Sequence, residues 1–305
     1  MAIIKLGIHT GPQDLSMAEL LRIWKRADDG GFHWISVWDH FYANPLQRRE
    51  NPCFEGVAAM AALAAATTRV RVGCLVFCAP FRTPGLLAKA AATIDHISGG
   101  RAEIGIGAGW LKEEFEDFGY PFPPLPRRLD QLEEALQVVR SLWREPVTNF
   151  AGEYYNLQRA VCGPKPLNPN MRLWVGGRGE RRTPRIAARY ADGFNMPYLP
   201  PAAVAQRLGA LAEACGRFGR DPQALDTSVN LHFQMSATAA AAAQREAVPA
   251  QLAASALLGP PQQAIDRIGE YVDAGVQGLN IALRPPVDWD ALEAFIEEVM
   301  PQFHR

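Results

Sequence analysis

The sequence has few cysteines, no long apolar run and no excess of charge of either sign. Its five cysteines, scattered over 305 residues, are odd in number, which argues against a disulfide framework and favours a reducing compartment. No apolar run approaches the roughly 20 residues that a membrane-spanning helix needs. The N-terminal residues lack the basic region and cleavage pattern of a signal peptide. We therefore expect a cytoplasmic protein.

The charges are balanced over the whole chain. Lys and Arg together number 31, Asp and Glu number 32, and the net charge is −1. Such a chain produces no global field that would draw it to nucleic acid or to an acidic membrane surface, so neither is an expected partner. Any anionic ligand must instead be held by a local cluster of cations.

Two familiar site motifs are also missing. There is no H-E-x-x-H segment, and no second metal-ligating side chain stands at helical spacing from Asp39 and His40, so we expect no metal. The glycine pattern at residues 105–110 has Trp110 where the dinucleotide-binding motif G-x-G-x-x-G needs its third glycine. This difference argues against a doubly wound Rossmann sheet.

Short apolar runs alternate with amphipathic patterns along most of the chain. The apolar runs predict eight strands, at residues 3–9, 34–40, 70–78, 102–109, 173–177, 193–196, 227–234 and 278–283. The amphipathic patterns predict helices at residues 17–30, 84–97, 128–143, 183–191, 260–274 and 289–300. Eight strands that alternate with helices predict an α/β fold, a (β/α)8 TIM barrel.

We expect one domain over residues 1–305, interrupted by two excursions. Residues from about 145 to 172 are rich in Pro, Gly, Asn and aromatics, and predict a hairpin. Residues from about 235 to 260 are rich in alanine and predict a helical segment, on the side of the barrel where lids occur.

The second predicted strand ends abruptly in Asp39 and His40. A parallel strand that is buried on both faces is a continuous apolar run, so titratable groups at its carboxyl end indicate where the interior opens onto a site. An imidazole titrates near neutral pH and can therefore donate or accept a proton. A buried histidine that pairs with backbone carbonyls remains the alternative interpretation of His40.

A cluster of glycine and arginine follows the fifth predicted strand, at the start of a helix. It comprises Gly176, Gly177, Arg178, Gly179, Arg181, Arg182 and Thr183. Backbone N–H groups of a glycine-rich turn, a helix N-terminus and nearby guanidinium groups together suit a phosphate. A plain glycine turn with a solvated basic helix start is the alternative.

Taken together, these segments resemble the luciferase-like monooxygenase superfamily, specifically its branch that uses the deazaflavin coenzyme F420. The resemblance is carried by Asp39-His40-Phe41 and by residues 97–110, 175–179 and 190–195, in that order along the chain. It implies a TIM barrel of the bacterial luciferase type and an oxidoreductase that transfers hydride. It also implies a homodimer, to which a flavin or F420 reductase supplies reduced cofactor.

The resemblance assigns roles to particular residues. It places catalytic His40 near the reactive carbon of the deazaflavin, Asp39 at the ring edge, and a non-prolyl cis peptide at Leu75-Val76 behind the ring. The cofactor-binding residues that it implies are Asp39, His40, Leu75, Val76, Cys78, Gly107, Gly109, Gly176, Gly177, Arg178, Gly179 and Thr183. Arg82, Arg178 and Arg182 would neutralise the acidic tail of F420. An ordinary buried strand, with Cys74 and Cys78 as small hydrophobic residues, is the alternative at the third strand.

Trp110 limits the reactions that we expect at this site. The F420-dependent sugar-phosphate dehydrogenases of this superfamily have a catalytic Glu at the corresponding place, and an indole cannot transfer a proton. Glucose-6-phosphate oxidation is therefore not expected, and His40 is expected to act without a partner carboxylate. The substrate pocket is expected to include His9, Phe41, Glu55 and Trp110, with a cap or a surface residue as the alternative interpretation of His9 and Glu55.

The sequence therefore predicts an oxidoreductase that transfers a hydride between F420 and a small organic substrate. The aromatic residues Phe41, Phe77, Trp110 and Phe115 favour an uncharged or electron-poor substrate with an activated C=C or C=N bond. The main alternative is a two-component monooxygenase that reacts reduced FMN with O2. A barrel that binds flavin without turnover is the third possibility.

Overall fold

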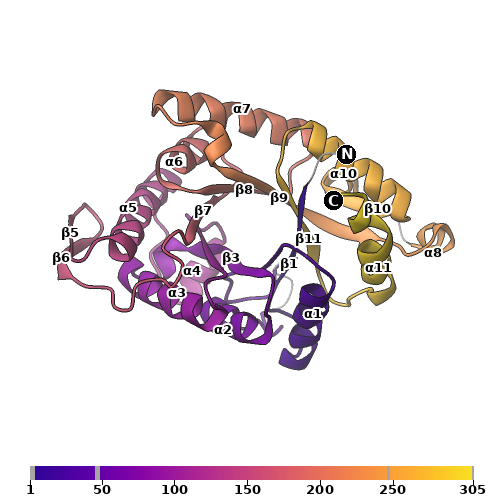
Figure 1. Ribbon diagram of the computed structural model, residues 1–305, viewed down its shortest axis with the longest axis horizontal. Helices are drawn as coiled ribbons and strands as arrows, with labels where there is room; N and C mark the ends of the chain where they lie inside the picture. The colour runs from indigo at the N-terminus through magenta and orange to yellow at the C-terminus, as the bar shows by residue number, and fades with distance from the viewer. Residues whose placement is uncertain (1–3, 45–48, 246–247, 304–305) are drawn as a thin grey trace.

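A closed barrel of eight parallel strands forms the centre of the molecule, with helices around it (Figure 1). The structure is a computed structural model that describes residues 4–44, 49–245 and 248–303. The barrel order is β1-β2-β3-β4-β7-β8-β9-β11, and β11 pairs with β1 to close the ring. The predicted TIM barrel is confirmed.

Each predicted strand overlaps one strand of the barrel. The barrel strands are β1 (Lys5–Thr10), β2 (Trp34–Val37), β3 (Arg71–Cys78), β4 (Ala102–Gly107), β7 (Arg172–Gly176), β8 (Gly193–Pro197), β9 (Asp226–Met235) and β11 (Gly278–Leu283). Every residue of β2, β4 and β11 is buried, as a parallel strand covered by helices requires. Since β2 ends at Val37, Asp39 and His40 lie on the turn that follows it and not on the strand itself.

Helices form the outer layer, and most of them contact the next helix around the barrel. The long helices are α1 (Met17–Asp29), α2 (Gly56–Ala66), α3 (Pro84–Ser98), α5 (Leu125–Arg144), α6 (Arg182–Tyr190), α7 (Pro201–Arg217) and α10 (Pro261–Asp273). The short ones are α4 (Lys112–Asp117), α8 (Ala239–Gln244), α9 (Ala250–Ala253) and α11 (Trp289–Ala294), which continues into η3 (Phe295–Val299) and η4 (Met300–Gln302). Single turns form η1 (Ala79–Phe81) and η2 (Pro222–Ala224). Among the described residues, no helix has the length and apolarity needed to cross a bilayer.

The two expected excursions contain additional elements. The first carries the antiparallel pair β5 (Thr148–Ala151) and β6 (Asn156–Ala160), which projects from the left of the barrel in Figure 1. The second contains α8 and α9 where one alanine-rich helix was expected, with residues 246 and 247 outside the described ranges. It ends in β10 (Ala256–Gly259), which the sequence did not predict. This strand pairs with the last residues of β9, where β9 extends beyond its pairing with β11.

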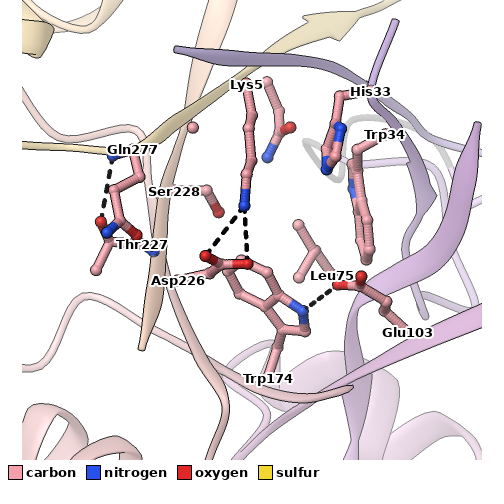
Figure 2. A pocket seen from close by; sticks show the side chains of 12 residues that line it. Lys5, His33, Trp34, Leu75, Glu103, Trp174, Asp226, Thr227, Ser228 and Gln277 are labelled. Atoms are coloured by element: carbon pink, nitrogen blue, oxygen red, sulfur yellow. Dashed lines mark hydrogen bonds and ion pairs between the residues drawn. The ribbon is translucent and has the colours of Figure 1, made fainter. Parts of the chain in front are cut away.

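Two indoles and a group of charges close the N-terminal end of the barrel (Figure 2). The rings of Trp34 and Trp174 lie 5.9 Å apart, and the Nε1–H of Trp174 donates to Glu103 at 2.6 Å. Lys5 Nζ lies 3.1 Å from both carboxylate oxygens of Asp226. The cavity between them has a volume of about 30 Å³, which is room for one or two water molecules. Because TIM-barrel active sites lie at the opposite end, we interpret this cavity as part of a structural closure.

Candidate active site

Side chains of the expected site converge at the C-terminal ends of the barrel strands. Asp39 and His40 follow β2, the cis bulge lies in β3, and the glycine-arginine turn follows β7. Arg284, which the sequence did not single out, follows β11. Chemistry in this fold is carried by residues at these strand ends.

The carboxylate of Asp39 is fully engaged by the protein. Asp39 is buried, and its Oδ2 accepts the N–H of Cys78 at 2.8 Å. Both of its oxygens accept from the guanidinium of Arg82, with Nη2 at 2.8 Å from Oδ1. Arg82 also donates to Glu55 at 3.0 Å, so its charge is neutralised within the protein. A coenzyme ring edge would have to share Asp39 with these donors, and Arg82 is not free to bind the coenzyme tail.

His40 has a partner carboxylate, contrary to the expectation from Trp110. Its Nδ1 lies 2.9 Å from Oε2 of Glu114, which is on α4 and only 1% exposed. The other oxygen of Glu114 accepts the N–H groups of Phe41 and Tyr42 at 2.8 and 3.0 Å. A carboxylate in this position orients the imidazole ring, as the acid does in a catalytic triad. Glu114 is the functional candidate that the sequence interpretation missed.

Two further histidines near the mouth are held in the neutral form. Burial, with a further contribution from the charge of Arg284, lowers the pKa of His9 to about 3. The Nδ1 of His9 lies 2.8 Å from the hydroxyl of Ser36. Burial also lowers the pKa of His232 to about 4, and its ring stacks on Tyr198 at 4.3 Å. Neither histidine is therefore a ready proton donor near neutral pH.

Arg284 is an unneutralised cation beside these histidines. Its guanidinium lies 5.2 Å from the ring centre of Trp38 and donates to the backbone carbonyl of Asn44. Its Nε is buried without a hydrogen-bond partner, and so is Nε1 of Trp38. Within the described ranges no carboxylate pairs with Arg284. Buried donors without partners are the kind of group that a bound ligand satisfies.

The predicted cis peptide at Leu75-Val76 is confirmed. The pairing register of β3 with β4 shifts around it, so the strand bulges at this place. The bulge turns the side chain of Val76 against glycines of the two next strands. A Cβ at Gly107 would lie 2.6 Å from Val76 Cγ2, and one at Gly176 would lie 2.6 Å from Val76 Cγ1. The packing of Val76 therefore accounts for glycine at both positions, which the resemblance gives as cofactor-binding residues.

Gly109 shapes the turn that presents Trp110. Its φ is +74°, and a Cβ there would lie 2.7 Å from both Cys78 Sγ and Phe115 Cζ. Trp110 is consequently turned outward, is 60% exposed and meets the His40 ring edge-on at 5.7 Å. Burial raises the pKa of the Cys78 thiol well above its ordinary value, so this cysteine stays protonated.

The other expected pocket residues are used in packing. Phe41 stacks on Phe118 at 4.1 Å and contacts Phe81 at 4.7 Å. Glu55 is the N-cap of α2 and accepts the N–H of Ala58 at 2.7 Å, which agrees with its interpretation as a cap. Of the other two expected pocket residues, Trp110 meets the ring of His40, and the ring of His9 lies 5.0 Å from that of Trp38.

The glycine-arginine turn leads into α6 and leaves the backbone N–H groups at the start of that helix without a side-chain cap. The N-cap, Arg181, makes no side-chain capping bond, and both Arg178 and Arg181 are exposed. A Cβ at Gly179 would lie 2.3 Å from Oγ1 of Thr183, so the turn wraps closely around that side chain. An uncapped helix N-terminus with two unneutralised cations fits a phosphate.

Arg182 does not share that role. It donates to Asp130 and, at 3.1 Å, to Glu133, so it is neutralised on α5. The Nε of Arg207 donates to the backbone carbonyl of Arg178 at 3.2 Å and holds the turn in place. Only Arg178, of the three arginines expected to bind the coenzyme tail, has no carboxylate partner among the described residues.

Comparison with known proteins finds relatives of this chain in sequence and in fold. The model of the luciferase-like monooxygenase family matches residues 2–251. The F420-dependent glucose-6-phosphate dehydrogenase of Gordonia bronchialis is 30% identical over 232 residues, which cover 75% of this chain and 68% of that protein. An F420-dependent secondary alcohol dehydrogenase, solved with an F420-acetone adduct, superposes with a TM-score of 0.86 at 20% identity over 100% of both chains. The coenzyme F420-dependent tetrahydromethanopterin reductase from Methanopyrus kandleri also gives 0.86 at 20% identity, covering 99% of this chain and 100% of that one. At such identities the two structures show the fold alone.

Proposed function

Because the chain belongs to the luciferase-like monooxygenase family of enzymes, we propose that it is an oxidoreductase that transfers a hydride between coenzyme F420 and a small organic substrate. The relative from Gordonia bronchialis, which is named as F420-dependent, supports this choice of cofactor. The observation that carries the proposal is the ordered imidazole of His40. It follows β2, the direct neighbour of the strand that bears the cis bulge.

The residues of the mouth fit the coenzyme in two places. The free N-terminus of α6, with Arg178 and Arg181, would hold its phosphate. The bulge at Leu75 and Val76 would support the back of its ring. When bound, F420 would supply or accept the hydride. His40 would exchange the proton that accompanies it, because an imidazole serves as acid or base near neutral pH.

The substrate in this proposal contains an activated C=C or C=N bond and no sugar phosphate. Trp110 presents an apolar ring beside His40, where a substrate would meet an aromatic surface. Arg284, whose Nε lacks a partner, would donate to an oxygen that withdraws electrons from the double bond. Hydride would add to one atom of that bond and the proton from His40 to the other.

A binding titration tests the cofactor. The purified protein is titrated separately with F420 and with FMN, and the absorbance of each cofactor is followed. We expect saturable binding of F420, weakened roughly tenfold or more in Arg178→Gln/Arg181→Gln because charge-assisted contacts to phosphate are lost. Arg217→Gln, an exposed arginine of α7, is the matched control and should bind normally. Saturable FMN binding without F420 binding would contradict the proposal and favour the monooxygenase alternative.

We also propose that the enzyme is a cytoplasmic homodimer that receives reduced cofactor from a separate reductase. All five cysteines are free, in keeping with a reducing compartment. Leu86 and Ile97 of α3 are 62% and 45% exposed, and Val161, on the segment after β6, is 66% exposed. Hydrogen bonds from Lys89 and His96 to residues 163 and 165 hold that segment along α3. Light scattering after gel filtration should give twice the chain mass, and a monomeric mass in Leu86→Glu.

A further inference from the structure

Three donors converge on the carboxylate of Glu114. Two are the backbone N–H groups of Phe41 and Tyr42, which can only donate, and both are directed at Oε1. The third contact joins Oε2 to Nδ1 of His40 at 2.9 Å. A carboxylate that accepts at both oxygens satisfies all three contacts if Nδ1 carries a proton.

The opposite nitrogen of His40 has a different neighbour. The side-chain amide nitrogen of Asn44, Nδ2, lies 3.4 Å from Nε2. The Asn44 N–H donates to Oε1 of Gln13 at 2.7 Å, and Nε2 of Gln13 donates to the Asn44 carbonyl at 3.0 Å, which anchors this residue. Because an amide NH2 group only donates, it faces Nε2 favourably when that nitrogen has a free lone pair. Both sides of the ring therefore favour the same tautomer.

We propose that Glu114 is a positioning residue that holds His40 as the Nδ1–H tautomer and makes Nε2 the nitrogen that exchanges a proton with the substrate. This inference rests on the proposed function. In the oxidative direction Nε2 would accept the substrate proton, and the imidazolium would keep its Nδ1–H on the Glu114 carboxylate; F420, when bound, would take up the hydride. In the reductive direction Nε2 returns a proton to the atom next to the one that receives the hydride.

Glu114 stands four residues after Trp110, the position where the sequence suggested that a carboxylate is missing. A carboxylate at position 110 would stand on an exposed turn, whereas Glu114 is buried behind the imidazole. It reaches His40 from the side opposite to Nε2, so it acts through the histidine and does not meet the substrate. The site thus has a carboxylate that orients the ring from behind.

Glu114→Gln removes the contact that orients His40 but keeps the acceptor that anchors the backbone of Phe41 and Tyr42. The side-chain oxygen of glutamine can still accept from Phe41 and Tyr42, but its NH2 group then faces Nδ1. Nδ1 must accept, so the proton moves to Nε2 and the ring presents the wrong tautomer. We expect the single-turnover rate of hydride transfer to fall roughly 10²- to 10⁴-fold, the range for loss of acid–base catalysis. The affinity for F420 should stay within about threefold, since the hydrogen bonds of Glu114 go to His40, Phe41 and Tyr42 and not to the α6 turn or the bulge at Leu75 and Val76, where we place the phosphate and the ring.

The tautomer is measured directly by long-range ¹H–¹⁵N correlation spectra of histidine-labelled protein without cofactor. The spectrum of His40→Asn identifies the His40 signals. In the neutral form of the ring, wild-type His40 should show a protonated Nδ1 and a free Nε2, and Glu114→Gln should show the reverse. A wild-type His40 with a free Nδ1 overturns the proposal, even if the variant does not fold.

Glu134 provides a matched control. It lies on α5 and accepts the backbone N–H groups of Glu153, Tyr154 and Tyr155 at 2.7, 2.9 and 3.1 Å, which is the same anchoring role without a histidine. Glu134→Gln should change neither the His40 tautomer nor the rate. Equal rates in Glu114→Gln and Glu134→Gln would overturn the positioning role. If the wild-type protein does not bind F420, the proposed function fails, and the spectra by themselves still decide whether Glu114 sets the tautomer.

Discussion

Replacing Gly107 by alanine should force a clash with the side chain of Val76. The added Cβ would lie 2.6 Å from Val76 Cγ2, about 1 Å inside ordinary van der Waals contact. Gly107 is buried at the end of β4 and has no left-handed φ, so alanine is compatible with its backbone. The clash is therefore the main cost, and overpacking of this kind costs about 1–3 kcal/mol.

For a chain of about 300 residues, that loss lowers the thermal midpoint by roughly 2 to 5 °C. Circular dichroism on heating and urea unfolding followed by tryptophan fluorescence would both measure it. Gly209→Ala on α7 is the matched control, because nothing lies within 4 Å of its added Cβ. In the interior of a helix that change should stabilise the protein by about 0.5–1 kcal/mol.

Val76→Ala removes the atom that causes the clash. The single variant measures how much free energy of unfolding Val76→Ala itself removes. The double variant with Gly107→Ala should then lose at least about 1 kcal/mol less than the two single variants lose together. Gly176→Ala approaches the other methyl of Val76, also at 2.6 Å, and should be rescued in the same way. Strict additivity, or a Gly107→Ala protein as stable as Gly209→Ala, would refute the view that these glycines accommodate Val76.

Three further predictions concern charges and protons. His40→Ala should bind F420 within a few-fold of wild type but transfer hydride roughly 10²- to 10⁴-fold more slowly in single-turnover absorbance measurements; an unchanged rate would favour a barrel that binds cofactor without turnover. Arg82→Gln should lower the free energy of unfolding, measured with urea, by about 3–5 kcal/mol, because it leaves the buried Asp39 carboxylate without its cation. Adding Asp39→Asn to the same chain should recover part of that loss. Burial lowers the pKa of His9 to about 3, whereas the unfolded chain binds that proton below about 6.5. The contribution of His9 to the free energy of unfolding should therefore fall by about 1.4 kcal/mol per pH unit from pH 6.5 towards pH 3. His9→Gln should lose that contribution to the slope between pH 7 and pH 5, and equal slopes in both proteins would count against a neutral His9.

The strands could be predicted because burial on both faces leaves a clear signal. Runs such as β4 and β11 are uninterrupted by charge except for Glu103, whose carboxylate is used inside the barrel by Arg71 and Trp174. By contrast β10 has only four residues and follows an alanine-rich stretch, so nothing local separates it from a helix. Its existence depends on the extension of β9, which is a tertiary feature.

The candidate site was predictable only in part, because some of its contacts depend on tertiary packing. Local sequence is enough to identify His40 and the turn at Gly177, since each has a characteristic residue type at the end of a predicted strand. Glu114 lies in Lys112–Asp117, a helix with four acidic residues among its six, and no local property distinguishes it from its exposed neighbours. Which of these carboxylates reaches His40 depends on how α4 packs against the turn after β2.

Pairing of charges, rather than their number, decides where a ligand can bind at this mouth. Arg82 and Arg182 were expected to bind an anion, yet each is neutralised by a carboxylate of the protein. Arg178, Arg181 and Arg284 have no such partner within the described ranges, and the first two flank the free start of α6. Since ion pairs form between segments far apart in the chain, composition cannot reveal which cations remain available. The free cations therefore place the phosphate at α6 in our proposal and leave Arg284, across the barrel mouth, for the substrate.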